Sequence, residues 1–376
     1  MSKRIVISGW YGHGNVGDEA ILQAMLDTFR KDWPDCDVTV LSCQPQYTRD
    51  LHNVKAVYQL PGPGLKSTLR SVCSGRYFKT LMAISKCDLF IMGGGGFLTD
   101  WIPDVPRRWL GQMRIAKLFG KRTMLYRIGA GPFSTKNGKR LTKHLINTYV
   151  DEVTVRENYS YAALTECVGV DSSKVTVRID PVATMDVGPY QTPNDGKLSL
   201  VYTPLYDRPQ YWNSQQCAKW SHLRECFMVQ VRTLLERGQK VRLLSFQPAL
   251  ESEHKLADEF RAAFSDEVDV VFPRDFREAI SYVSASVGVI SLRLHGNIIA
   301  YALGKPFLPI IYHHKTKGFL DMIGYQPENI VLETGDGMNW PDLPLVPDEW
   351  QEKTNGFLDL LSRGEIGVFY KKRHFP

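Results

Sequence analysis

A cation and a titratable ring lie close together in the segment Ser291-Leu-Arg-Leu-His-Gly-Asn-Ile-Ile-Ala-Tyr-Ala-Leu-Gly-Lys-Pro306. The apolar run 287–292 predicts a buried strand, and 296–303 predicts a helix that is ended by glycine and proline. Arg293 and His295 then occupy the turn between them, where arginine offers a planar fork to carboxylate or phosphate and histidine moves protons near neutral pH. The segment predicts a site for an anionic substrate. A structural ion pair of Arg293 and a helix cap at His295 are the alternative.

A glycine-rich loop, Gly9-Trp-Tyr-Gly-His-Gly-Asn-Val-Gly-Asp-Glu-Ala20, follows the first predicted strand. Its glycines match the G-x-G-x-x-G pattern of dinucleotide sites. However, Asp18 and Glu19 fall in the first helical turn, where they would repel a pyrophosphate. The second strand also ends without the acid that would hold a ribose hydroxyl. The loop therefore argues against a nicotinamide cofactor.

The same loop suits a neutral polyol. Glycines allow close backbone approach, Asn15 and Asp18 can bind hydroxyls, and Trp10 and Tyr11 offer flat faces to a sugar ring. The alternative is a tight turn followed by a capped helix, because acids favour helix starts.

Four glycines, Gly93–Gly96, follow another buried strand and leave the backbone free to line a ligand or form an anion-binding nest. Gly94 and Gly95 are the candidates for that contact. Asp100, just beyond, either accepts a hydroxyl proton or caps the next helix.

Two further cations follow strands in the same way, Arg156 after 152–155 and Lys315 after 307–311. Each alone is typical of a surface salt bridge, but ligands of open parallel sheets bind at the carboxyl ends of strands. His313 and His314 lack matching cysteine or carboxylate spacing, so we expect no metal site.

Composition narrows the class of protein. Of 376 residues, 43% are hydrophobic and 23% charged, as in soluble globular proteins, and the net charge of +6 is too mild to indicate nucleic acid. The 7 cysteines are scattered without a C-x-x-C pair, typical of reduced thiols. We expect no secretory segment, because the first residues run straight into a predicted strand, and the sequence contains no long apolar run. We expect a cytoplasmic protein and leave a peripheral contact with the inner face of the membrane open.

Strand and helix patterns alternate along the chain, which predicts parallel α/β sheets. In the first half the predicted strands are 4–8, 38–41, 89–92, 123–128 and 152–155, and the helices are 18–29, 65–85, 107–119, 139–149 and 159–166. In the second half the strands are 198–202, 240–246, 268–272, 287–292 and 307–311, and the helices are 214–236, 252–264, 276–284, 296–303 and 348–361.

The turn-rich segment 186–197 predicts a linker between two domains, 1–185 and 198–376. Each half is Rossmann-like, and two such halves facing across a cleft form the glycosyltransferase-B architecture. The residues above would place a neutral polyol on the first domain and an anionic ligand on the second. By analogy with that fold, the last helix would pack back on the first domain.

Taken together, the motifs resemble the polysaccharide pyruvyl transferase family. The matching pieces are Gly12-x-Gly14-Asn15-x-Gly17-Asp18-Glu19-Ala20, Gly93–Gly96, Val155-Arg156-Glu157, Asp180-Pro181, Arg293-Leu-His295, Gly304-x-Pro306, and Tyr312-x-x-Lys315 followed by Phe319 and Gly324. They extend from residue 9 to about 324. Most similar is the branch that acts on secondary cell-wall polymers, the glycans that anchor bacterial surface-layer proteins.

The resemblance implies transfer of an enolpyruvyl group from phosphoenolpyruvate to a sugar, giving a cyclic ketal and phosphate. The acceptor would be the 4,6-hydroxyl pair of an N-acetylmannosamine on a lipid-linked saccharide. Arg156, Arg293 and His295, with Lys315, Gly94 and Gly95, would form the donor site. Tyr11, His13, Asn15, Asp18, Glu19 and Asp100 would face the acceptor.

The residues fit this chemistry. His295 is the candidate acid that protonates the methylene carbon of phosphoenolpyruvate, and Asp18 or Asp100 is the candidate base. No cofactor or metal is required. The rival hypothesis is a nucleotide-sugar glycosyltransferase on the same fold, although the predicted helix 296–303 lacks the acid that often holds the nucleotide.

Overall fold

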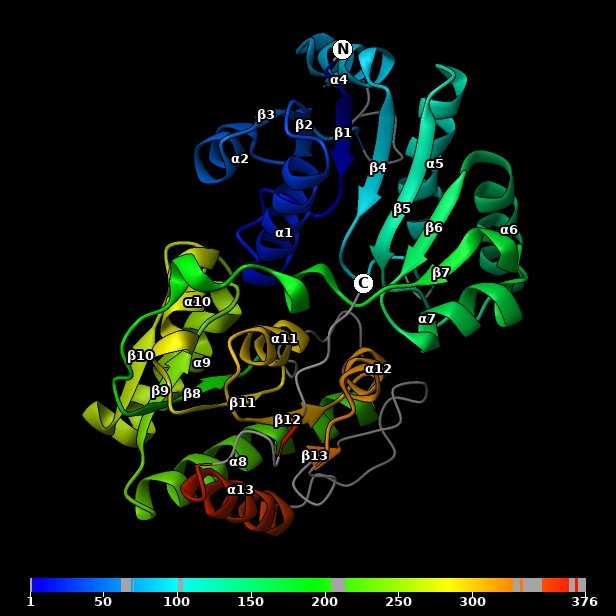
Figure 1. The fold of residues 1–376 in the computed structure, drawn as a ribbon. Helices are drawn as coiled ribbons and strands as arrows, with labels where there is room; N and C mark the ends of the chain where they lie inside the picture. Colours follow the sequence, from blue (N-terminus) through cyan, green and yellow to red (C-terminus); the bar gives the residue numbers. More distant parts are fainter. Residues whose placement is uncertain are drawn as a thin grey trace. The chain divides into compact units, whose positions relative to one another are not determined.

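The computed structural model describes residues 2–61, 69, 71–100, 104–203, 214–326, 332–333, 347–364 and 369–370. Two compact units make up the chain, Met1–Met185 and Asp186–His374. Each contains one parallel sheet with helices on both faces (Figure 1). The predicted fold class, two Rossmann-like α/β units, is confirmed.

The first unit holds a seven-stranded sheet in the order β3-β2-β1-β4-β5-β6-β7. Its strands are β1 (Arg4–Ser8), β2 (Asp37–Ser42), β3 (Lys55–Tyr58), β4 (Leu89–Gly93), β5 (Arg122–Ile128), β6 (Glu152–Val155) and β7 (Val175–Val177). Its helices are α1 (Val16–Asp32), α2 (Pro45–His52), α4 (Arg76–Lys86), α5 (Val105–Leu118), α6 (Lys136–Tyr149) and α7 (Asn158–Ala162). All described strand pairs are parallel.

The strand order reverses between β1 and β4, which pair directly. At such a switch point the connections from two neighbouring strands run to opposite sides of the sheet. Ligands of open sheets bind in the crevice that this leaves outside the carboxyl ends of the strands. The glycine-rich loop 9–15 follows β1, and the glycine run 93–96 follows β4. The topology therefore brings both predicted loops to one place in the first unit.

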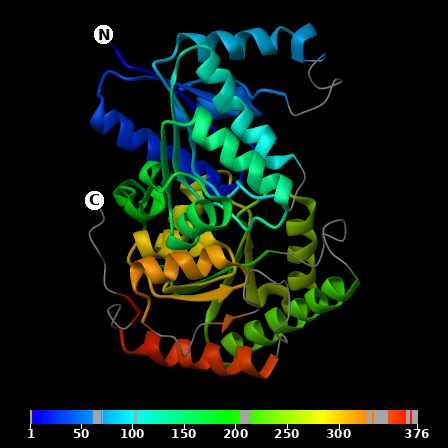
Figure 2. The ribbon, with the colours of Figure 1, turned by 90° about the vertical axis from the view of Figure 1, so that its right-hand side faces the viewer.

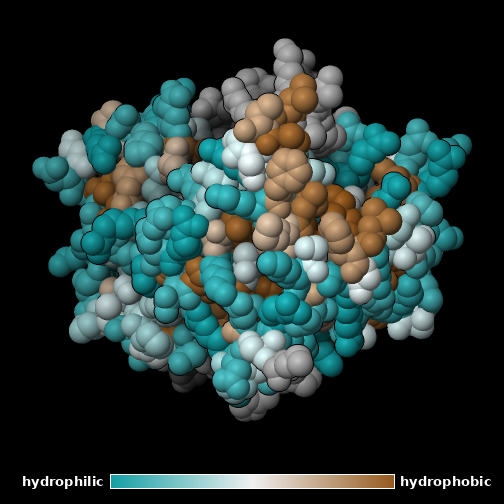
Figure 3. Space-filling view, turned by 90° about the horizontal axis from the view of Figure 1, so that it is seen from above, coloured by the Kyte–Doolittle hydropathy of each residue, from teal (hydrophilic) through white to brown (hydrophobic). Residues whose placement is uncertain are grey.

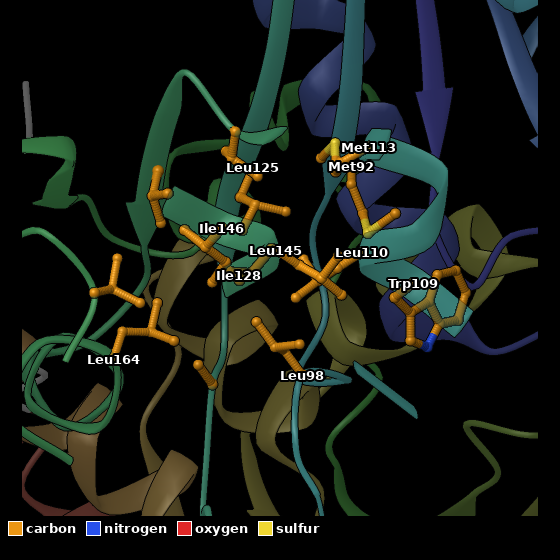
Figure 4. Packing of buried hydrophobic residues seen from close by; sticks show 14 of the residues in the cluster. Met92, Leu98, Trp109, Leu110, Met113, Leu125, Ile128, Leu145, Ile146 and Leu164 are labelled. Atoms are coloured by element: carbon orange, nitrogen blue, oxygen red, sulfur yellow. The ribbon is translucent and has the colours of Figure 1, made fainter. Parts of the chain in front are cut away.

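A hydrophobic core fixes this sheet against α5 and α6 (Figure 4). Met92, Leu125 and Ile128 from the strands pack with Leu110 from α5 and Ile146 from α6, all of them fully buried. Because this face is apolar and closely packed, the strand ends and the loops that leave them are held on a rigid base.

The second unit holds a six-stranded sheet in the order β10-β9-β8-β11-β12-β13. Its strands are β8 (Lys197–Val201), β9 (Lys240–Leu244), β10 (Val268–Val271), β11 (Gly288–Ser291), β12 (Phe307–Ile311) and β13 (Leu332–Glu333). Its helices are α8 (Ser214–Glu236), α9 (Glu251–Phe264), α10 (Phe276–Ala285), α11 (Leu294–Ala302), α12 (His314–Ile323) and α13 (Pro347–Ser362). The order reverses between β8 and β11, as it does between β1 and β4.

The last helix packs within this second unit. Helix α13 runs alongside α8 (Figures 1 and 2), and the amide of Gln230 donates to the hydroxyl of Thr354 at 2.9 Å. Trp350 of α13 is buried edge-on against Phe227 of α8. An apolar face carrying Trp350 and Phe357 is buried on α8 and the sheet of its own unit, while packing of this helix on the first domain stays a prediction.

Several elements differ from the predicted pattern. Helix α2 and strands β3, β7 and β13 are absent from the predicted pattern. Helix α11 begins at Leu294 instead of Gly296, so His295 lies inside its first turn and Arg293 is its N-cap residue. Part of the helix predicted over 65–85, and Trp101 beside Asp100, lie outside the described residues. None of the helices in the described ranges has the length and apolarity needed to cross a membrane.

Candidate functional site

The turn from β11 to α11 places Arg293 at the carboxyl edge of the second sheet. Ser291 ends the buried strand, and its hydroxyl donates to the backbone carbonyl of Arg293 at 2.7 Å. Gly296 is required there, because a Cβ at this position would lie 2.2 Å from the Ser291 hydroxyl. The tight turn therefore fixes the Arg293 side chain beside the ends of β8 and β9.

One nitrogen of Arg293 is held by three acceptors. Its Nη2 donates to Thr203 Oγ1 at 3.0 Å and to Gln247 Oε1 at 2.9 Å, and it forms an ion pair with Glu253. Thr203 follows β8, Gln247 follows β9, and Glu253 lies in the first turn of α9. Glu253 is itself buried and accepts from the hydroxyl of Ser245 at 2.8 Å. The guanidinium is thus oriented by three neighbouring elements.

Another nitrogen of Arg293 is unused. Its Nε is buried and has no hydrogen-bond partner among the described residues. A buried donor left unpaired costs about 1–3 kcal/mol, more when charged, so such atoms are rare outside sites that a ligand completes. The side chain as a whole retains 15% exposure. An oriented guanidinium with an open donor is suited to bind a carboxylate or phosphate oxygen.

His295 and Lys315 lie in the first turns of two neighbouring helices. His295, half-buried, follows Arg293 by two residues in α11. Lys315 lies in α12 beyond β12, the strand that pairs with β11, and its backbone N–H donates to Nδ1 of the cap residue His313 at 3.3 Å. Both predicted residues therefore sit beyond the carboxyl ends of adjacent strands, in helical turns instead of loops.

In the first unit, buried polar groups fix the glycine-rich loop. Glu19 is fully buried, and its two oxygens accept from the Gly12 N–H at 2.8 Å and contact His52 Nε2 at 3.0 Å. Tyr11 is also buried and donates to the carbonyl of Gly93. Burial raises the pKa of Tyr11, so it stays a neutral donor. Both side chains are enclosed and hold the loop in shape, and their contact with an acceptor stays a prediction.

Asn15 and Asp18 open helix α1. The side chain of Asn15 caps it by accepting from the N–H groups of Gly17 at 2.9 Å and Asp18 at 3.3 Å. Asp18 is half-buried, and a Cβ at Gly95 would lie 3.2 Å from its Oδ1. At Gly94, with φ of +66°, a Cβ would lie 1.9 Å from Ile21. The glycine run thus allows α1 to approach β4 and places Asp18 against it.

His13 is the residue of this loop with an open polar atom. Its ring stacks on Trp10 with centroids 4.0 Å apart, and its Nε2 is buried without a hydrogen-bond partner in the described part of the chain. Burial lowers the pKa of His13, and Arg108 adds to that effect while Glu19 opposes it. A neutral imidazole beside the partly exposed face of Trp10 suits a sugar hydroxyl and ring.

Arg156 lies in a buried ion-pair network. Its Nε contacts Glu157 at 3.2 Å and its Nη1 contacts Asp180 at 3.0 Å, with all three side chains almost fully enclosed. Burial alone would lower the pKa of Arg156, but the carboxylates of Glu157, Asp180 and Asp18 outweigh it and raise the pKa above its usual value. Because two contacting carboxylates balance its charge, Arg156 is the least suited of the predicted cations to hold a further anion.

Asp100 stabilises the loop before α6 by accepting hydrogen bonds. One carboxylate oxygen accepts from the backbone and hydroxyl of Ser134 at 2.7 and 3.2 Å, and the other accepts from the backbone and hydroxyl of Thr135 at 2.7 Å each. Burial opposes ionisation of Asp100, but these donors outweigh it and lower its pKa. A carboxylate with four donors is a poor base, which weakens the predicted proton-accepting role of Asp100. The alternative, a cap on the next helix, is wrong, because Asp104 is the N-cap residue of α5.

The sequence interpretation missed the groups that support these residues. Thr203 and Gln247 follow strands at the carboxyl edge, the same rule that selected Arg156 and Lys315, and could have been found that way. Glu253 and His52 are helical residues far along the chain from their partners, and no local pattern marks them.

Comparison with known proteins decides the family. The family model described as polysaccharide pyruvyl transferase matches residues 15–314, which includes α1, the glycine run, Arg156, Arg293 and His295. The chain belongs to the polysaccharide pyruvyl transferase family. It is therefore a transferase enzyme, and a polysaccharide acceptor is implied by the family. No curated protein matches its sequence.

Solved structures share the fold of this pyruvyl transferase. A UDP-GlcNAc 2-epimerase from Neisseria meningitidis aligns with a TM-score of 0.59 at 13% identity, covering 98% of this chain and 95% of that one. A UDP-GlcNAc 2-epimerase from Methanocaldococcus jannaschii gives 0.57 at 12%, covering 100% and 94%. A glycosyltransferase from Rickettsia africae gives 0.54 at 11%, covering 96% and 89%. At such identities the likeness shows the fold alone, of glycosyltransferase-B type.

Proposed function

We propose that this enzyme transfers the enolpyruvyl group of phosphoenolpyruvate to two hydroxyls of a sugar, forming a cyclic ketal and releasing phosphate. The observation that carries the donor assignment is Arg293, oriented through Nη2 and left with a buried open donor at Nε. Phosphoenolpyruvate carries a carboxylate and a phosphate, which are the groups that guanidinium recognises best.

The donor site in this proposal is built around Arg293 and His295, with Lys315 as a further cation beyond the adjacent strand. Arg156, Gly94 and Gly95 remain donor-site predictions from the family resemblance. We give Arg156 less weight because Glu157 and Asp180 neutralise it.

The chemistry requires one acid and two losses of hydroxyl protons. His295 donates a proton to the methylene carbon of the enol, which leaves positive charge at the neighbouring carbon. One sugar hydroxyl adds to that carbon and loses its proton. The second hydroxyl then displaces phosphate, loses its proton and closes the ketal. Asp18, beside the glycine run, is the candidate base, since Asp100 is already committed to four donors.

The acceptor in this proposal is a neutral saccharide recognised by the glycine-rich loop of the first unit. Asn15 and Glu19 set the shape of the loop, while Trp10 and His13 offer a ring face and a neutral polar atom. By family resemblance we propose the 4,6-diol of an N-acetylmannosamine in a lipid-linked cell-wall glycan of the kind that anchors surface layers.

Incubation with phosphoenolpyruvate and a panel of synthetic saccharides tests this proposal. We expect phosphate release that depends on both substrates, and a product whose mass corresponds to the acceptor plus the pyruvyl ketal. A saccharide lacking one hydroxyl of the pair is the matched control and should give no ketal. The absence of phosphate release with every diol acceptor would contradict the proposal.

A nucleotide-sugar glycosyltransferase is the second candidate, favoured by the fold shared with a glycosyltransferase and with epimerases that bind UDP-GlcNAc. Thermal shift separates the two hypotheses. We expect phosphoenolpyruvate to raise the unfolding temperature and UDP-GlcNAc to leave it unchanged. Stabilisation by UDP-GlcNAc alone would favour the second candidate.

A further inference from the structure

We propose that helix α4 and the end of helix α5 form a docking surface for an anionic lipid bilayer. This surface consists of Phe78, Lys79, Met82 and Lys86 on α4, and of Leu118, Phe119 and Lys121 at the end of α5. The inference concerns how the enzyme attaches to a membrane, and it does not depend on the donor and acceptor proposed above.

Large apolar side chains are exposed on this surface. Phe78 and Met82, one helical turn apart on α4, are 58% and 54% exposed, and Leu118 at the end of α5 is 74% exposed. The opposite face of α4, with Thr80 and Ile84, is buried against the sheet. Few large apolar side chains are this exposed elsewhere in the described part of the chain, and clustered exposure of this kind marks an interaction surface.

The two helix ends belong to one region. Helix α4 leads directly into β4 and α5 into β5, so their last turns lie at the amino ends of two strands that pair directly. Lys121, after α5, influences the thiol of Cys87 after α4: burial raises the pKa of Cys87 to about 11, and Lys121 opposes the rise. Figure 1 shows α4 at this end of the unit, and Figure 3, viewed from that side, shows apolar atoms running across it among hydrophilic ones.

The charge on this surface has one sign. Helix α4 contains Arg76, Lys79 and Lys86 and no acid. Lys79, Lys86 and Lys121 form no ion pair with any residue in the ranges that the structure describes. Two acids that directly precede β4 and β6 are engaged with other cations, Asp88 with Arg4 at 2.9 Å and Asp151 with Lys117 at 2.6 Å. Unpaired lysines beside exposed Phe and Met side chains match a bilayer with anionic headgroups, into which the apolar side chains insert.

A second copy of the chain fits the same surface poorly. In a two-fold symmetric dimer the same patch faces itself, so Lys79 and Lys86 would meet their own copies without an acid between them. A lipid surface supplies the missing negative charge. Charge complementarity therefore favours the bilayer over self-association.

Vesicle flotation of the full chain tests this proposal. We expect binding to vesicles of phosphatidylcholine mixed with phosphatidylglycerol, and none to phosphatidylcholine alone. The variant Lys79→Glu/Lys86→Glu should bind at least about 25-fold more weakly, from about five-fold per lysine removed. The variant Phe78→Ser/Met82→Ser should lose binding while keeping its circular dichroism spectrum. The control Lys136→Glu/Arg140→Glu makes the same charge change on exposed residues of α6 and should bind like the wild type.

Three results would overturn the proposal. The first is equal or absent binding of the wild type to the two kinds of vesicle. The second is wild-type binding by both α4 variants, or an equal loss in the α6 control, which would indicate a general charge effect. The third is a dimer in analytical ultracentrifugation that Phe78→Ser/Met82→Ser dissociates, which would assign the surface to self-association.

Discussion

The carboxyl edges of the two sheets share a topology but differ in how their polar groups are satisfied. In the first unit Glu19, Arg156 and Asp100 are enclosed and bonded to other parts of the unit. Among the described residues of that edge, Nε2 of the neutral His13 ring is a buried atom without a hydrogen-bond partner. Such atoms in the second unit include the charged donor Nε of Arg293.

This difference indicates which substrate each edge can bind. An edge whose charges are internally balanced and whose open atom is neutral favours a polyol. An edge with an oriented guanidinium, a histidine and a nearby lysine favours a small anion. In the second unit, charged side chains are available to bind a ligand. In the first unit, buried charged side chains stabilise the loops.

The largest expected effect is on turnover, at His295 in the anion-binding edge. If His295 is the acid, His295→Ala should lower kcat by about 10²–10⁴-fold while phosphoenolpyruvate still binds. Phosphate release and calorimetric titration measure the two quantities. His144→Ala, an exposed histidine of α6, is the control and should keep normal turnover. Near-normal turnover of His295→Ala would remove it from the mechanism.

The next effect is on stability, at Arg156 in the balanced edge. Arg156→Met leaves Glu157 and Asp180 without their buried cation, and we expect the free energy of unfolding to fall by about 3–5 kcal/mol. The control Arg122→Met breaks an exposed pair with Glu152 and should cost less than about 1 kcal/mol. Denaturant unfolding measures both. Unchanged stability together with loss of phosphoenolpyruvate binding would instead make Arg156 a donor ligand.

A smaller loss of stability is expected at Asp100. Asp100→Ala removes an acceptor of four hydrogen bonds, and we expect a loss of about 2 kcal/mol. Because the folded pKa of Asp100 is lowered, its contribution is complete above the ordinary carboxyl pKa and disappears as the pH falls through the lowered value. The wild type should therefore lose more stability on acidification than Asp100→Asn. Equal acid sensitivity of the two proteins would contradict this role.

The smallest effect concerns the acceptor, at His13. His13→Ala should raise the acceptor KM by about three- to ten-fold, the value of one neutral hydrogen bond, and leave kcat nearly unchanged. Since the pKa of His13 is lowered, the ring is neutral at and above pH 7 and gains a proton only in more acidic solution. The wild-type acceptor KM should rise as the pH falls through that lowered pKa, and the variant should lack this rise. An identical pH profile of the two would place His13 outside the acceptor site.

Much of the fold could be predicted because long apolar strands and amphipathic helices alternate. The apolar run before Arg293 and the glycines that follow strands 4–8 and 89–92 identified the strand ends correctly. Elements with little periodicity were missed. Helix α2 has mostly polar residues, Pro-Gln-Tyr-Thr-Arg-Asp-Leu-His, and β3 has four residues, too few to establish alternation.

The places of the candidate residues along the sheets could be predicted, but their hydrogen-bond and ion-pair partners could not. Asp18, Asp100 and Arg293 all lie near strand ends as expected, yet only the fold shows that Asp100 meets Ser134 and Thr135 while Arg293 meets Glu253. Such partners are distant in sequence. The residue type alone does not distinguish a side chain that binds a substrate from one that forms a structural ion pair. Tyr11 illustrates the limit, because its aromatic ring is buried under the loop that it was expected to serve.

The most direct test of the account is the affinity of phosphoenolpyruvate for Arg293→Ala, measured by isothermal titration calorimetry beside the wild type and Arg237→Ala. Arg237 forms an exposed pair with Asp359 in the same unit and controls for loss of a positive charge. We predict about 100-fold weaker binding by Arg293→Ala, from loss of a charge-assisted contact, and wild-type affinity for Arg237→Ala. Phosphoenolpyruvate binding of wild-type strength by Arg293→Ala would contradict the placement of the donor at this edge of the second unit.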